Sequence, residues 1–185
     1  MTTEPWERDD PAWPVHDAVV AWETPFFEGG YDAVERPDGE RANYYWLQPS
    51  NAAIVLAVTG DDELVLVEQY RPRLRAHTIG LPAGGIEDDE EPAAAARREL
   101  REETGFDPAG VSILEDFWVA TGVLRHRRAI AFAEGLEPVD RNLDDNEFLT
   151  VTSIPVDEAL GVARSEPAND ATIEGLLLAR EDGLL

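Results

Sequence analysis

The sequence contains no cysteine, which excludes a disulfide framework, a thiolate zinc site and a cysteine nucleophile. It has no apolar run approaching the roughly 20 residues that a membrane-spanning helix needs. Residues 1–14 are acidic and lack a basic stretch followed by an apolar one, so no secretory signal is predicted. We therefore expect a cytoplasmic protein with no membrane partner.

Lysine is also absent, and all 15 basic residues are arginines, against 39 acidic residues. The formal net charge is −24 at pH 7. A nucleic-acid-binding protein needs a cationic surface to displace counterions, so this charge argues against nucleic acid as a partner. A polyanionic small substrate would need bound cations. Acid excess without lysine also resembles the halophile-like composition of proteins from salt-adapted organisms, whose surface repulsion is screened by salt.

The length of 185 residues suits one domain with a small additional element. Composition changes near residue 48, from a proline- and aromatic-rich opening to a regular succession of strands and helices. We expect residues 1–48 to form a β-rich accessory segment and residues 49–185 to form the main domain. The accessory segment is predicted to hold a small sheet, with strands over 16–22, 31–36 and 42–47 and a turn at Pro37-Asp38-Gly39.

The main domain is predicted to mix helices and strands. Apolar runs over 52–58 and 64–69 flank the turn Gly60-Asp61-Asp62, which is the pattern of a hairpin. The clearest helix spans 92–104, because proline fits its first turn, alanines favour it, and Gly105 suits the residue past its end. Further strands are predicted over 111–119, 128–134 and 148–153, and further helices over 156–164 and 169–180.

Three carboxylates stand out within the predicted helix. Glu99, Glu102 and Glu103 occupy positions i, i+3 and i+4 and therefore share one helical face. A solvated acidic face is one interpretation in so acidic a chain. The other is a site for Mg²⁺, which takes one or two protein carboxylates together with water and substrate phosphates. Arg98, four residues before Glu102, is placed to pair with a carboxylate and orient the cluster.

The segment from Gly84 to Phe106 reads GGIEDDEEPAAAARRELREETGF and resembles a complete Nudix box at every defining position. The resemblance implies an α/β fold, a Nudix-type α/β/α sandwich with a mixed sheet, plus the small N-terminal antiparallel element. It also implies Mg²⁺ or Mn²⁺ held against a pyrophosphate by Glu99 and Glu103, assisted by Glu102 and the carbonyl of Ala83. Catalytic roles for Glu102, Glu103 and Arg98 follow from the same resemblance.

Segments flanking the box resemble ADP-ribose pyrophosphatases. Upstream, these are VEQYRP at 67–72 and LPAGG at 81–85, which imply that Arg71, Gln69, Gly84 and Gly85 bind the substrate. Glycines at 84 and 85 would permit close approach of the backbone. Downstream, the acidic run 144–147 resembles the loop that supplies the catalytic base, with Asp145 and Glu147 as candidates. Asn169 is predicted to cap the last helix.

Two positions depart from that subgroup. Thr121 stands where its members usually carry a proline, and His126 stands at the usual acidic residue of the same loop. A histidine titrates near neutral pH, so His126 is a third candidate for the base, although an exposed loop histidine is also a plain explanation.

The resemblance implies hydrolysis of ADP-ribose to AMP and ribose 5-phosphate. One alternative is a Nudix hydrolase of another nucleotide sugar or a dinucleotide. A second, from a different class, is a Nudix-fold sensor that binds ADP-ribose without cleaving it. Family members of this type are commonly homodimers in which the N-terminal sheet crosses to the partner, so residues 1–48 are also the expected dimerisation segment.

Overall fold

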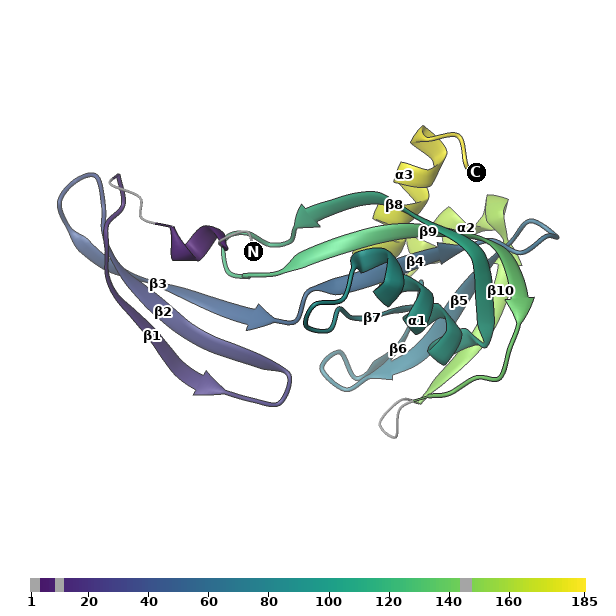
Figure 1. Cartoon of the computed structure of the whole chain (residues 1–185), viewed down its shortest axis with the longest axis horizontal. Helices are drawn as coiled ribbons and strands as arrows, with labels where there is room; N and C mark the ends of the chain where they lie inside the picture. The colour runs from purple at the N-terminus through teal and green to yellow at the C-terminus, as the bar shows by residue number, and fades with distance from the viewer. Residues whose placement is uncertain (1–3, 9–11, 144–147) are drawn as a thin grey trace. The chain divides into compact units, whose positions relative to one another are not determined.

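The computed structural model describes residues 4–8, 12–143 and 148–185. The chain divides into two compact units, one formed by residues 1–50 with 118–126 and the other by 51–117 with 127–185. The first unit contains the short 3₁₀ helix η1 (Pro5–Glu7) and the strands β1 (Val15–Glu23), β2 (Phe27–Glu35) and β3 (Arg41–Pro49) (Figure 1). These strands form an antiparallel sheet in the order β1-β2-β3, as predicted.

Strand β2 begins at Phe27, four residues before its predicted start. The additional residues include Gly29 and Gly30, which are poor strand formers by propensity. Their lack of a side chain is what the packing requires, because a Cβ at Gly30 would lie 1.9 Å from the Val19 carbonyl oxygen. The β2–β3 turn closes as predicted, with Gly39 at φ 82° and its N–H donating to the Arg36 carbonyl at 2.9 Å.

The second unit contains seven strands and three helices in the described part of the chain. They are β4 (Ala52–Ala57), β5 (Glu63–Arg71), β6 (Ala76–Gly80), β7 (Ala83–Gly85), α1 (Pro92–Thr104), β8 (Phe106–Trp118), β9 (Arg127–Pro138), β10 (Leu149–Pro155), α2 (Val156–Ala163) and α3 (Asp170–Glu181). One sheet has the order β7-β4-β9-β8, and the other has the order β10-β5-β6. β4 pairs in parallel with β9 and antiparallel with β7, so the first sheet is mixed.

The predicted hairpin between residues 52–58 and 64–69 is wrong. β4 and β5 lie in different sheets and share only an isolated bridge between Val58 and Leu64. β4 over residues 53–57 and β5 over residues 64–67 are apolar and buried on both faces, as strands covered on two sides are. Each is an interior strand of its own sheet, β4 between β7 and β9 and β5 between β10 and β6.

Two buried clusters cover the two faces of β4. Ala53, Val55 and Ala57 pack in one cluster with Ala95, Ala96 and Leu100 of α1. Ile54 and Leu56 pack in the other, with residues of α2 and α3 such as Ala159 and Leu176. The helices therefore lie on opposite faces of the sheets, which is the predicted α/β/α sandwich. Each fully buried leucine contributes about 1.5–3 kcal/mol through removal of its side chain from water.

The ends of the helices follow the local signals. α1 begins with Pro92, and Gly105 beyond its end has φ 74° and donates its N–H to the Arg101 carbonyl at 3.0 Å. α3 begins after Asn169, whose side chain accepts the Thr172 N–H at 3.0 Å, as predicted. No helix among residues 4–8, 12–143 and 148–185 combines the length and the apolar character needed to cross a membrane.

Candidate active site

Helix α1 turns one face into the protein and thereby sets the burial of its glutamates. Ala95, Ala96 and Leu100 are fully buried against β4. Glu99 and Glu103 lie beside this face, with only 7% and 4% of their surface exposed. The side chain of Glu102, in contrast, keeps 35% of its surface exposed. Carboxylates are seldom buried to this extent unless hydrogen bonds or cations compensate for the loss of water.

Glu103 is held against the short strand β7. Its Oε2 accepts the backbone N–H of Ala83 at 2.9 Å. β7 pairs with β4, with Ile54 opposite Ala83, and the Val55 N–H donates to the Pro82 carbonyl at 2.9 Å. The pairing of β7 with β4 in the first sheet therefore brings Ala83 to the C-terminal half of α1. The group of Ala83 that contacts the carboxylate is its N–H. The carbonyl of Ala83, which was predicted to bind the metal, is a separate group of the same residue.

Glu99 faces Gly84, the first residue of the box. A Cβ at Gly84 would lie 2.0 Å from both the Cδ and the Oε1 of Glu99. No side chain fits there while Glu99 keeps its position. The backbone of β7 and two buried carboxylates of α1 are therefore in close proximity, and glycine at 84 is what makes that possible.

Arg98 connects the carboxylates. Its guanidinium binds both oxygens of Glu90, with Nε–Oε1 at 3.0 Å and Nη2–Oε2 at 2.9 Å. Nη1 donates to Glu99 at 2.7 Å and to Glu102 at 3.2 Å, and Nη2 donates to the Gly85 carbonyl at 2.7 Å. One planar cation thus spans the loop before the helix and two of the three glutamates.

These hydrogen bonds shift the pKa values of both partners. Hydrogen bonding to Arg98 lowers the pKa of Glu90 against the opposing effect of burial, and the Glu87 N–H, at 3.0 Å from Oε2, adds to the lowering. The pKa of Arg98 rises above its ordinary value, chiefly through its bond to Glu90. The pair stays ionised at neutral pH and holds the orientation of the helix-borne glutamates.

A second ion pair fastens the outer face of α1. Arg97 binds Asp107 in bidentate fashion at 2.7 and 2.9 Å, and Arg101 approaches the same carboxylate at 3.6 Å. Hydrogen bonding to Arg97 lowers the pKa of Asp107. Beside this face lies a cavity of about 200 Å³, lined by Arg98, Arg101, Glu102, Asp140 and Asn142.

The oxygen ligands available at this site suit a hard divalent cation. Glu99, Glu102 and Glu103 offer carboxylate oxygens, and the absence of a side chain at Gly84 leaves room for the Glu99 carboxylate beside β7. Oxygen ligands of this kind are those of Mg²⁺, and clustered carboxylates without a counter-charge repel one another. Among the residues that the structure describes, no three acidic or histidine side chains already converge at a metal-binding distance. A cation held here would therefore also draw on water and substrate oxygens.

Two further predicted residues, Gln69 and Arg71, lie on the α1 face of β5. Val65 packs with the α1 residues, and side chains alternate along a strand, so Gln69 and Arg71 follow on the same face. Arg71 is exposed near the end of the strand. Asp145 and Glu147 lie outside the described residues. His126 belongs to the first unit, where its carbonyl accepts the Val119 N–H at 3.1 Å.

One participant, Glu90, was missing from the predicted site residues, and it is the strongest partner of Arg98. Gly85 was predicted to bind the substrate, and in the structure its carbonyl accepts a hydrogen bond from Arg98. The signal for Glu90 is its place in the box, eight residues before Arg98. A separation of eight residues across a loop does not reveal a contact, because the path of the loop depends on the turn at Glu87–Glu90.

Comparisons with known proteins agree with this geometry. The NUDIX domain family matches residues 48–176. An ADP-ribose pyrophosphatase of Bacillus subtilis is 32% identical over 140 residues, covering 75% of this chain and 76% of the relative. The methanol dehydrogenase activator of Bacillus methanolicus is 32% identical over 142 residues, covering 76% and 77%. The crystal structure of an ADP compounds hydrolase has the same fold, with a TM-score of 0.82 at 24% identity over 96% of this chain and 98% of that one.

Proposed function

The chain belongs to the Nudix family of hydrolases, and we propose that it cleaves the pyrophosphate bond of a nucleoside diphosphate linked to another group, with ADP-ribose as the preferred substrate. The observation that carries the proposal is the meeting of two buried carboxylates with a glycine-bearing strand. Glu99 and Glu103 are almost fully buried, and both face the backbone of Ala83–Gly84. Such a site is suited to a cation and a phosphate chain, and a solvated acidic face would leave this burial unexplained.

We propose that Mg²⁺ or Mn²⁺ is the cofactor, with Glu99 and Glu103 as principal ligands and Glu102 and the Ala83 carbonyl assisting. A bound divalent cation neutralises charge on the two phosphates and favours deprotonation of a water molecule. Glu102 is the most exposed of the three carboxylates, and its contact with Arg98 is the longest of that network at 3.2 Å. It can therefore leave Arg98 at a smaller cost than Glu90 can.

The protein's own groups position the substrate and accept the proton. Arg98 holds Glu99 and Glu102 in place through its anchor on Glu90. Gly84 and Gly85 allow a phosphate to approach the backbone of β7, while Gln69 and Arg71 reach the substrate from the α1 face of β5. We propose Asp145 or Glu147 as the proton acceptor.

ADP-ribose is proposed as the substrate because the Bacillus subtilis relative bears the name ADP-ribose pyrophosphatase and the similarity covers three quarters of each chain. The products would be AMP and ribose 5-phosphate. A substrate of this small size agrees with the net charge of −24, which opposes binding of nucleic acid. The proposed cytoplasmic location follows from the proposed substrate, since nucleotides are metabolites of that compartment.

We also propose that residues 1–48 form a dimerisation segment and residues 49–185 the hydrolase domain. Every residue of β1 except Val19 is exposed, and β1 is an edge strand of its sheet. Its exposed apolar side chains include Val15, Val20 and Trp22, at 48–51% exposure. An edge strand with an apolar surface is a ready site for pairing with another chain. Light scattering of the purified protein tests the dimer, and a monomer at micromolar concentration would refute it.

The test of function is turnover of a substrate panel by the purified protein with Mg²⁺. The panel contains ADP-ribose, nucleotide sugars, NADH and nucleoside triphosphates, with products separated by chromatography at low and high salt. AMP and ribose 5-phosphate from ADP-ribose alone would support the assignment. Glu103→Gln should abolish turnover, whereas Glu137→Gln, the same change at an exposed carboxylate of β9, should preserve it. Binding of ADP-ribose without turnover of any compound would instead favour the sensor.

A further inference from the structure

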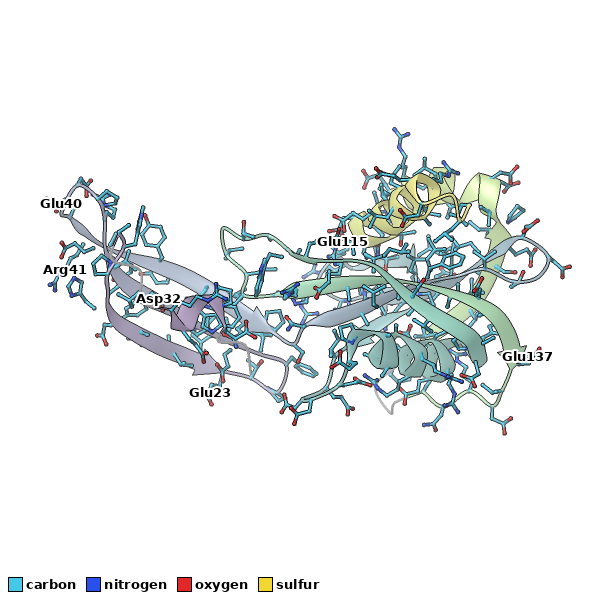
Figure 2. The ribbon with its side chains drawn as sticks, turned by 45° about the horizontal axis from the view of Figure 1, so that its top comes forward. Glu23, Asp32, Glu40, Arg41, Glu115 and Glu137 are labelled. Atoms are coloured by element: carbon cyan, nitrogen blue, oxygen red, sulfur yellow. The ribbon has the colours of Figure 1, made fainter. Side chains whose placement is uncertain are left out.

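The tip of the β5–β6 hairpin concentrates positive charge in an otherwise acidic chain. Three of the 15 arginines, Arg71, Arg73 and Arg75, fall within five consecutive residues that contain no acid. All three are exposed. Acidic side chains elsewhere project from the surface, for example Glu23, Glu40, Glu115 and Glu137 in Figure 2. Residues 125–128 also hold three arginines without an acid, but those arginines are partly buried and ion-paired. The hairpin tip is therefore the exposed one of these two cationic runs and is suited to binding an anion.

These three arginines differ from most others in their pairing. Arg97, Arg98, Arg125, Arg127 and Arg128 each form at least one ion pair. Within the part of the chain that the structure describes, no ion pair involves Arg71, Arg73 or Arg75. Because acids outnumber arginines by more than two to one, intramolecular partners are abundant. The hairpin thus keeps three guanidinium groups available for a ligand.

The backbone of the hairpin holds these groups in a defined place. β5 and β6 pair up to Arg71 opposite Ala76, and the Leu74 N–H donates to the Arg71 carbonyl at 3.0 Å. The rings of Tyr70 and His77 pack across the strands with centroids 5.4 Å apart. Arg75 has φ 53°, a conformation in which glycine avoids the strain that a side chain causes. An arginine in this strained conformation is explained if its guanidinium binds a ligand.

The hairpin leads into the proposed site from both of its strands. β5 carries Arg71 on the face that α1 covers, and β6 runs through Leu81 and Pro82 into Ala83, the partner of Glu103. Arg71 and the cation would serve the diphosphate, which carries one negative charge on each phosphate. The guanidinium groups of Arg73 and Arg75 are then not required to neutralise the diphosphate. At about 0.15 M salt, charges act over roughly 8 Å, so they would act on a group close to the hairpin.

We propose that Arg73 and Arg75 are specificity-determining residues that bind a third phosphate on one sugar of the substrate. The inference rests on the proposed function and narrows it to nucleoside diphosphate derivatives that carry a further phosphate. Arginine suits this role because its planar fork binds phosphate oxygens in pairs. Two exposed arginine–phosphate ion pairs should raise kcat/KM about tenfold over that of the substrate without the third phosphate.

The experiment compares kcat/KM for ADP-ribose with kcat/KM for ADP-ribose bearing a phosphate at the 2′ position of adenosine or at C1″ of the terminal ribose. The wild-type protein should prefer one phosphorylated compound by about tenfold. Arg73→Gln with Arg75→Gln should reduce that ratio to about one while changing turnover of ADP-ribose little. Arg164→Gln with Arg180→Gln removes the same charge from exposed positions of the α2 and α3 ends and should preserve the ratio.

A ratio of one in the wild type, or an equal ratio in the hairpin variant, would overturn the proposal. The same comparison is made by calorimetric binding in a Glu103→Gln background. If the wild type hydrolyses none of the compounds but this binding preference is present and depends on Arg73 and Arg75, the proposed function fails and the hairpin assignment stands. If hydrolysis of ADP-ribose is observed without the preference, the hairpin assignment fails alone.

Discussion

Gly84→Ala tests whether the position of the Glu99 carboxylate limits catalysis. The new Cβ would lie 2.0 Å from Cδ and Oε1 of Glu99. Since Cβ atoms essentially never approach such neighbours within 3.0 Å, the carboxylate has to withdraw by about 1 Å. That movement also strains its 2.7 Å bond from Arg98 Nη1. The substitution therefore acts on a proposed metal ligand without changing any charge.

The expected loss of activity follows from this displacement. A shift of about 1 Å at a group that orients the reaction costs on the order of 100-fold in rate, equivalent to about 2.7 kcal/mol in the activation barrier. The effect on folding should be smaller. Gly84 does not have a positive φ, and the clashing atoms are the end of a flexible side chain. Overpacking and reduced backbone entropy of the unfolded chain offset each other, leaving a loss of about 0–2 kcal/mol in the free energy of unfolding.

The assay measures kcat/KM for ADP-ribose over a range of Mg²⁺ concentrations, together with the thermal midpoint. Gly60→Ala is the matched control, because nothing lies within 4 Å of a Cβ at that turn residue. Its kcat/KM should equal that of the wild type. A folded Gly84→Ala protein with kcat/KM within threefold of wild type would refute the reasoning, since the carboxylate would then tolerate the displacement.

Three other predictions follow from the described contacts. Glu90→Gln should lower the free energy of unfolding by about 1–2 kcal/mol at pH 7. Because the pKa of Glu90 is lowered in the folded protein, its contribution to stability is present above about pH 4.5 and is lost as the pH falls through the folded pKa. The thermal midpoints of variant and wild type should therefore converge in acid. A difference in midpoint that stays constant with pH would contradict this. Asn169→Ala removes the N-cap of α3 and should lower the free energy of unfolding by about 1 kcal/mol, which corresponds to about 2–4 °C in the thermal midpoint measured by calorimetry. Asn142→Ala, outside any helix, is the control and should leave the midpoint unchanged. Raising NaCl from 0.1 to about 2 M should raise the thermal midpoint, because salt screens repulsion within a chain of net charge −24, and an unchanged midpoint would remove the case for salt adaptation.

The prediction of the fold succeeded where short-range rules decide. Helix α1 was predicted at its observed bounds, because Pro92 and Gly105 mark its two ends. The three strands of the N-terminal sheet were also expected. β2 was predicted to start four residues too late, because its first residues include two glycines, which have low strand propensity. Strands β6 and β7 were not predicted. β7 has three residues, two of them glycine, and exists through its pairing with β4.

The sequence by itself determined the spacing of Glu99, Glu102 and Glu103 on one helical face, because helical periodicity is a local property. The box at 84–106 likewise identified the family that residues 48–176 match. Only the tertiary structure decided that Glu99 and Glu103 are buried, that Glu90 anchors Arg98, and that β4 and β5 belong to different sheets. Each of these depends on partners brought together by packing of the whole unit, and burial and strand pairing have no signature in a short segment of sequence.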